Sequence, residues 1–326
     1  MLLIEDVTQD EGGHCVGHMM RRVHGEWQAS PALLDSEALA GQHRQASHAE
    51  NRGCDEVGDD DGDRAERAGR TAVTDFDAAL AGFAGMDEEA LARAWPWRDK
   101  QMDVRYALYR TLEDAQEAHV RVSAGRHPES RRILALAQRA FGDLRGLLIG
   151  LPPDLLDTAP RAGEWPIRET LRHVLLVERR YATQTRYAVE RADAEPVRLP
   201  DDRQPTAAPT DVGGAIGEIL AKIAAARAET NRWLGDVTPA AMTRPTVWAT
   251  HEIDVRFRLH RFAPHIVEHS IQCEKTLLAL GWRPTEGRRI VRAIAAVIGE
   301  VEGLGALAGA REVESQLVER FASVRS

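Results

Sequence analysis

Three histidines have the spacing and the setting of metal ligands. His265 and His269 are four residues apart, so on a helix they share one face with about 6 Å of axial rise between them. Such a pair can grip one ion, although histidines at this spacing also occur on helix surfaces for solubility, or hydrogen-bonded in cores. His173 falls on the apolar stripe of another segment, where an unpaired imidazole would be costly to bury. Three imidazoles with an open fourth position match a catalytic metal site.

Two neighbouring residues are candidates for supporting roles. Cys273 lies one turn beyond His269, but about 12 Å of helical rise separates it from His265, too far for one ion to contact all three. A packed core cysteine is therefore the better interpretation. Glu169, one turn before His173, could accept a hydrogen bond from the second nitrogen of that ring, as metal-bound histidines commonly require. A solvated glutamate is an equal alternative.

A basic cluster precedes the histidine pair, and its members are Arg256, Arg258, His260 and Arg261. Guanidinium groups bind carboxylates through a rigid fork of donors, so this cluster could receive the carboxylates of a cofactor. The interspersed Glu252 and Asp254 favour an ordinary charged surface instead.

The elements that must position these residues are helices. No segment passes the alternation test for a strand, and apolar residues recur every three to four positions from residue 74 onward. This pattern predicts two short helices between 74 and 112, and then helices near 130–150, 164–192, 211–234, 251–280, 285–303 and 308–323. Asp211 is a plausible N-cap, Pro264 should kink its helix or mark the true start, and Gly281 should close it. An all-α, antiparallel four-helix bundle is the natural arrangement.

Four regions follow from this pattern. Residues 1–70 lack periodicity and contain an acidic run, so we expect them to be mostly disordered. A helical N-terminal extension covers 71–129, the main bundle covers 130–283, and C-terminal helices cover 284–326. The first region also holds histidines and cysteines that could form a second metal site, but their spacings fit no zinc module. They are His14, Cys15, His18, His24, His43, His48 and Cys54.

Composition limits the function classes. The chain has 326 residues, enough to bury a core without disulfides or a structural metal. Its three cysteines are too few and too scattered for a disulfide framework, and no stretch has the roughly 18 apolar residues that span a bilayer. A net charge of -9 argues against sequence-independent binding of nucleic acid. We therefore expect a cytoplasmic protein that binds neither membranes nor nucleic acid.

Two motifs carry a resemblance to a known family. The segment from Glu164 to His173 resembles the second-helix signature of the DinB/YfiT-like superfamily, in which a tryptophan precedes the first metal histidine by eight residues. The segment from His265 to Gln272, followed by Leu-Gly-Trp at 280–282, is similar to the closing motif of that family. The resemblance implies a four-helix bundle, usually a homodimer, that binds zinc or nickel through His173, His265 and His269.

The resemblance also implies chemistry. Members of the superfamily include S-transferases that use low-molecular-weight thiols such as bacillithiol or mycothiol, a mycothiol-dependent maleylpyruvate isomerase, and a domain of the ergothioneine sulfoxide synthase. We therefore expect metal-dependent transfer of a low-molecular-weight thiol to a small electrophile. A noncatalytic, stress-related bundle that binds a metal or a small molecule is the alternative. A helical interaction protein with incidental histidines is a third hypothesis.

One further segment invites comparison with the first motif. Residues 103–110 faintly echo Trp165 to His173, with Arg110 where the histidine would fall. This segment is either a degenerate half-repeat or another amphipathic helix, and the second interpretation is favoured because amphipathic helices share such patterns.

Overall fold

The computed structural model describes residues 6–9, 15–23, 26–31, 75–208, 212–248 and 250–325. The chain divides into two compact units, Met1–Gly58 and Asp59–Ser326. In the first unit, β1 (Asp6–Gln9), β2 (Cys15–Val23) and β3 (Glu26–Pro31) form an antiparallel sheet in that order. The expected disorder of 1–70 and the histidine-rich alternative metal site concern residues that lie largely outside the described part, and they stay predictions.

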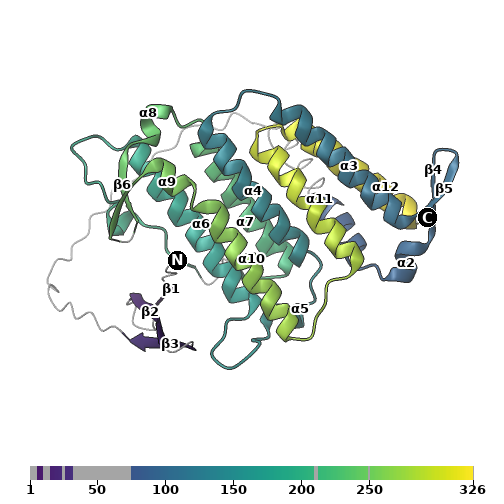
Figure 1. Cartoon of the computed structure of the whole chain (residues 1–326), viewed down its shortest axis with the longest axis horizontal. Helices are drawn as coiled ribbons and strands as arrows, with labels where there is room; N and C mark the ends of the chain where they lie inside the picture. The colour runs from purple at the N-terminus through teal and green to yellow at the C-terminus, as the bar shows by residue number, and fades with distance from the viewer. Residues whose placement is uncertain are drawn as a thin grey trace, which may run out of the picture. The chain divides into compact units, whose positions relative to one another are not determined.

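A four-helix bundle forms the part of the second unit that holds the three histidines (Figure 1). Its helices are α4 (Glu129–Leu148), α6 (Ile167–Glu190), α7 (Ile216–Leu234) and α10 (Phe262–Ala279). Helix α4 packs on α10 and α7, and α6 packs on the same two helices. The short α5 (Pro153–Asp157) and the 3-10 turn η1 (Asp201–Arg203) lie in the connections. The predicted all-α bundle is confirmed, and the bounds of α4 and α6 are close to those expected.

A buried ion pair holds three of these helices in register. Arg227 of α7 is fully buried and donates to Glu178 of α6 across 2.8 Å. The same guanidinium donates to Gln138 of α4 at 3.3 Å, and the hydroxyl of Thr230 donates to Glu178 at 2.6 Å. Because every charged group in this cluster has a partner, the cluster fixes how α6 is rotated against its neighbours.

The ends of α10 follow its sequence. Pro264 is the third residue of the helix, a position whose N–H would have no partner within the helix in any case. At the other end Gly281 adopts a φ of 82°, and the N–H of Trp282 donates to the carbonyl of Leu277 at 3.0 Å. Pro264 therefore marks the true start of the helix and Gly281 closes it, as expected. The proposed N-cap Asp211 lies outside the described residues, and Ala215 precedes the first turn of α7.

The sheet of β1, β2 and β3 and two short hairpins in the second unit were not predicted, because no segment was expected to form a strand. The first hairpin pairs β4 (Ala94–Trp97) with β5 (Lys100–Asp103), and the second pairs β6 (Pro245–Trp248) with β7 (His251–Asp254). The expectation that a helix begins near His251 was wrong, because the chain first forms β7, then α9 (Val255–Leu259), and only then α10. Strands of four residues are too short to show alternation.

The two hairpins are copies of one motif. Each follows a short helix, α2 (Glu88–Ala92) or α8 (Pro239–Met242), and each leads into a helix capped by an aspartate. Asp103 accepts from the N–H of Tyr106 at 3.0 Å, and Asp254 accepts from the N–H of Phe257 at 2.7 Å. Residues 91–110 and 242–261 align without a gap, sharing Arg, Trp, Asp-Val-Arg, Leu and Arg at matching positions. Residues 103–110 therefore do belong to a repeat, but their counterpart is 254–261 rather than 165–173.

The repeat extends to a second group of helices. This group comprises the helix over 75–84, α3 (Val104–Ser123), α11 (Glu286–Gly303) and α12 (Leu307–Arg325). Helix α3 is one long helix, where the sequence predicted a short one. It packs on α11 and α12 (Figure 1), as α10 packs on α4 and α6.

Helices α4 and α11 join the two groups through facing glycines. A Cβ placed on Gly142 would lie 2.2 Å from the carbonyl oxygen of Ala295, and one on Gly299 would lie 2.6 Å from that of Gln138. Gly146 and Gly303 repeat this relationship against Arg292 and Ala135. Because glycine has no side chain, the two helix backbones approach closely along this line.

No helix in the described part of the chain is both long and apolar enough to cross a membrane.

Candidate metal centre

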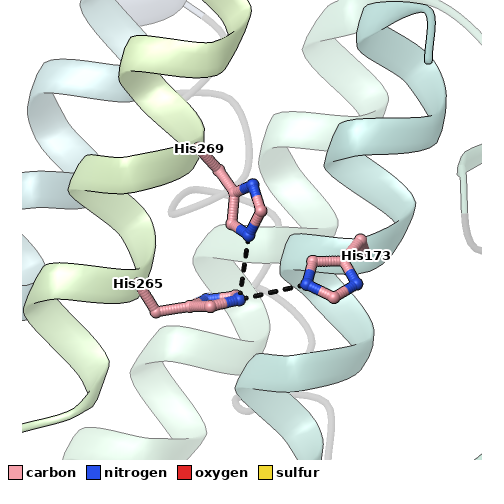
Figure 2. Close-up of side chains that lie close together, drawn as sticks. All are labelled: His173, His265 and His269. Atoms are coloured by element: carbon pink, nitrogen blue, oxygen red, sulfur yellow. Dashed lines mark hydrogen bonds between the residues drawn. The ribbon is translucent and has the colours of Figure 1, made fainter. Parts of the chain in front are cut away.

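The three predicted histidines meet inside the first bundle. Figure 2 shows His173 on α6 turned toward His265 and His269 on α10. The Nε2 atom of His265 lies 3.2 Å from Nε2 of His173 and 3.1 Å from Nε2 of His269. Nitrogens bound to one tetrahedral ion at the usual zinc distance lie about 3.3 Å apart. The arrangement therefore fits a single divalent ion held by three Nε2 atoms.

Gln272 fixes the orientation of one ring. The Nδ1 atom of His269 lies 2.8 Å from Oε1 of Gln272, one turn further along α10. An amide oxygen can only accept, so this contact places the proton of His269 on Nδ1 and leaves the Nε2 lone pair directed at the other rings. Metal-bound histidines commonly use their second nitrogen in this way.

Burial keeps the site ready for a cation. Removal from water lowers the pKa of His173 to about 4, with smaller contributions from the charges of His269 and Arg180. The pKa of His265 lies well below its usual value for the same main reason, and nearby His269, His173 and Arg261 lower it further. A neutral imidazole is the form that binds a metal. These two rings could therefore bind a cation without first losing a proton at neutral pH.

Aromatic rings line the histidines. The ring of Trp165 lies 5.6 Å from that of His173, and the ring of Tyr181 lies 5.7 Å from that of His265. Tyr181 also packs edge-on against Phe262 at 5.5 Å. Trp165 and His173 are only partly buried, whereas His265 and His269 are buried.

The other candidates from the sequence take different places. Glu169 pairs with Arg172. Cys273 is buried, and its burial raises the pKa of the thiol to about 12, which is the behaviour of a core cysteine. Among the described residues, the one group that can hold a metal ion consists of the three histidines.

The basic cluster separates into residues with different surroundings. Arg256 pairs with Glu129 at 2.7 Å, and His260 is exposed. Arg258 is only 3% exposed, and Arg261 stacks over the ring of Trp248 at 4.6 Å. Sequence reasoning favoured a plain charged surface for all four, and this is wrong for Arg258, because the hairpin β6–β7 covers that part of α9.

The second group of helices has no equivalent ligand set among its described residues. Repeat equivalence places Asp114 at the position of His265 and Ala118 at that of His269. Arg320 of α12 binds Thr111 at 2.7 Å and Asp114 at 2.5 Å, much as Tyr181 of α6 contacts Phe262 and His265. An ion pair therefore occupies the position where the first bundle holds its imidazoles.

The fold and the site together define a helical bundle with a three-histidine centre that can hold one metal ion. Comparison with protein families agrees with this description, because residues 136–273 match the family model of the DinB superfamily. This part of the chain is a DinB-superfamily domain. No curated protein matches the chain.

Proposed function

We propose that His173, His265 and His269 bind one divalent ion, zinc or nickel, and that the bundle transfers a low-molecular-weight thiol to a small electrophile. The metal part of the proposal rests on two distances. The Nε2 atom of His265 lies 3.2 Å from Nε2 of His173 and 3.1 Å from Nε2 of His269. The residues present fit the ion, because burial favours the neutral form of His173 and His265 and Gln272 already orients the ring of His269.

The chemical part follows from the donor set. Three neutral ligands leave the double positive charge of the ion intact, and a bound cation of this kind lowers the pKa of a coordinated thiol so that thiolate is available at neutral pH. With a chloro-aromatic electrophile, a carbon–sulfur bond forms, the carbon–chlorine bond breaks, and chloride leaves with the bonding electrons. The thiol proton passes to solvent.

The chain would supply the surroundings for that reaction. Trp165 and Tyr181 flank the histidines with apolar rings, and Trp165 is partly exposed, so an apolar electrophile can pack beside the site. Among the described residues, the charged groups that influence the pKa of His173 and His265 are basic or imidazole groups. This setting also suits the alternative, a noncatalytic bundle that binds metal or a small molecule, because in the described part of the chain no carboxylate is among those groups.

The first experiment measures metal content. The purified full chain should contain about one zinc or similar ion, and changing His173, His265 or His269 to Ala should deplete it. Retention of a full equivalent by the triple variant would place the metal elsewhere, with the histidine-rich N-terminal segment as the next suspect.

The second experiment measures turnover. Metal-replete protein is assayed with mycothiol, bacillithiol and glutathione against a chloro-aromatic or epoxide electrophile, beside the His269→Ala variant. A rate above that in buffer, lost in the variant, supports thiol transfer. Full metal content without any acceleration favours the noncatalytic binding module.

A further inference from the structure

Arg258 is a buried cation without a counterion among the described residues. Its side chain is 3% exposed, and its donors reach two neutral acceptors, Oε1 of Gln184 on α6 and the main-chain carbonyl of Val247 on β6. Its Nε atom is buried and has no hydrogen-bond partner in that part of the chain. Burial lowers the pKa of the guanidinium to about 10, and the nearby charge of Arg198 lowers it further, whereas Tyr181 acts in the opposite direction. A buried charge of this kind is normally paired.

Arg261 lies one turn further along the chain and also lacks a counterion among the described residues. Its guanidinium stacks on Trp248 at 4.6 Å, and its buried Nε atom has no partner within the described ranges. Its main-chain carbonyl accepts from the N–H of His265 at 3.3 Å, so the residue lies directly before the first histidine of the pair. In the described part of the chain, no carboxylate forms an ion pair with Arg258 or Arg261, although the neighbouring Arg256 has two such partners, Glu129 and Asp254.

Another buried arginine shows what a purely structural arrangement looks like. Arg288 donates to the carbonyls of Leu147 and Ile149, at 2.9 and 2.7 Å, where α4 ends. The C-terminal end of a helix carries partial negative charge, which compensates the cation. Arg258 differs, because its acceptors are a side-chain amide and the carbonyl of a short strand.

The repeat within the chain provides an internal control. The position equivalent to Arg258 is Ala107, and the position equivalent to Arg261 is Arg110. Arg110 also lies over the hairpin tryptophan, Trp97, and has a buried Nε atom without a partner among the described residues. Its charge is nevertheless compensated, because it pairs with Glu113 and with Asp114, the latter at 3.2 Å. At these positions the second group of helices thus has neither imidazoles nor uncompensated guanidinium groups, whereas the first bundle has both on one continuous segment. The capping aspartate and the tryptophan of the hairpin are kept in both copies, as expected for structural residues.

We propose that Arg258 and Arg261 form an oxyanion subsite beside the histidine cluster, which binds a carboxylate of the molecule that the site receives. The role of this subsite in thiol transfer rests on the function proposed above, whereas anion binding itself does not. Each guanidinium has a buried Nε atom without a partner among the described residues, and a carboxylate is a planar acceptor that matches the Nε edge of a guanidinium. Trp248 holds Arg261 in place by stacking on it, which reduces the rotamer freedom lost on binding.

The test uses the full chain freed of metal by a chelator, so that no ion can attract the probe. Isothermal titration calorimetry measures succinate, inorganic phosphate and uncharged succinamide. We expect saturable binding of succinate, no binding of succinamide, and at least a tenfold loss of succinate affinity in Arg261→Gln. Arg256→Gln, on the same short helix but already paired, should change the affinity less than twofold. Binding of phosphate in place of succinate would assign the same subsite to a phosphate ester and overturn the carboxylate assignment.

The variant at the buried position needs a check of folding. Arg258→Gln should keep the circular dichroism spectrum of the parent chain and lose succinate affinity to a similar degree, and if it does not fold, Arg261→Gln decides alone. Equal succinate affinity in Arg261→Gln and the parent chain, or no binding of either anion, overturns the proposal. Because metal content and thiol turnover are measured separately, failure of thiol transfer leaves this result interpretable.

Discussion

Gln272 hydrogen-bonds to His269, one of the three candidate metal ligands, from the same helix, α10. With 2.8 Å between Nδ1 and Oε1, the amide determines which nitrogen of the ring is free. A ligand that is held in one tautomer and one rotamer loses less entropy when an ion binds.

Replacing Gln272 with Leu should therefore weaken metal binding without removing it. We expect a loss of about 10-fold to 100-fold in affinity, the usual effect of deleting such a partner. Competition with a chelating dye measures this change. Gln272→Glu keeps an acceptor at the same place and should retain most of the affinity. Equal affinity in the Leu variant would show that the contact does not support the ligand.

The ion pair between Arg227 and Glu178 should be essential for stability. Glu178→Ala leaves a fully buried guanidinium without its carboxylate, so we expect the free energy of unfolding to fall by about 3–5 kcal/mol. Urea denaturation measures it. The double variant Glu178→Leu with Arg227→Met removes both charges and should recover much of this loss. A double variant no more stable than the single one would count against an uncompensated charge as the cause.

Stability should also decrease between mildly acid and neutral pH because of Glu314. Burial, with a further contribution from Glu302, raises the pKa of Glu314 to about 7, so the folded state binds this proton more tightly than the unfolded state. The resulting stabilisation is complete below the unfolded pKa near 4.5 and is lost as the pH rises through about 7. Glu314→Gln should therefore be more stable than the parent at pH 8, by about 1–3 kcal/mol, and nearly equal to it at pH 4. Thermal melts at both pH values test this, and an equal difference at both would rule out titration as the cause.

A methyl group at Gly142 should disturb the contact between α4 and α11. Because the added Cβ would lie 2.2 Å from a main-chain oxygen, the helices must separate, and we expect Gly142→Ala to cost about 1–3 kcal/mol. Gly217→Ala is the matched control, since that glycine also lies in a helix but a Cβ added to it would meet nothing within 4 Å in the described part of the chain. The control should be neutral or stabilising by up to about 1 kcal/mol. Denaturation midpoints compare the two, and equal effects would contradict tight packing at Gly142.

The helices of the bundle were predictable because their signals are local. Apolar periodicity, Pro166 at the start of α6 and Gly281 after α10 all act within a few residues. The histidine pair was visible from its spacing, and His173 from its apolar neighbours and from Trp165. Gln272 was recognised as part of the family motif, but its contact with Nδ1 of His269 could be assigned only from the structure.

Other features depend on contacts between distant segments. The hairpins β4–β5 and β6–β7 have strands too short for a periodic signal, and the residues of one were assigned to the start of a helix. The arginines of α9 look alike in sequence, and only the position of Glu129 on α4 and of β6 above α9 distinguishes the paired Arg256 from the buried Arg258. Pairing and burial of this kind cannot be deduced from residue order alone.

The facing glycines of α4 and α11 restrict which substitutions the contact between the two groups of helices can accept. Gly142 of α4 faces Ala295 of α11, and Gly299 of α11 faces Gln138 of α4. A bulkier residue at either glycine therefore alters the packing of both groups of helices at once. A larger side chain at Gly142 or Gly299 would therefore separate the two groups of helices, whereas an exchange at the positions of His265 and Asp114, which lie on α10 and α3, would not touch this contact.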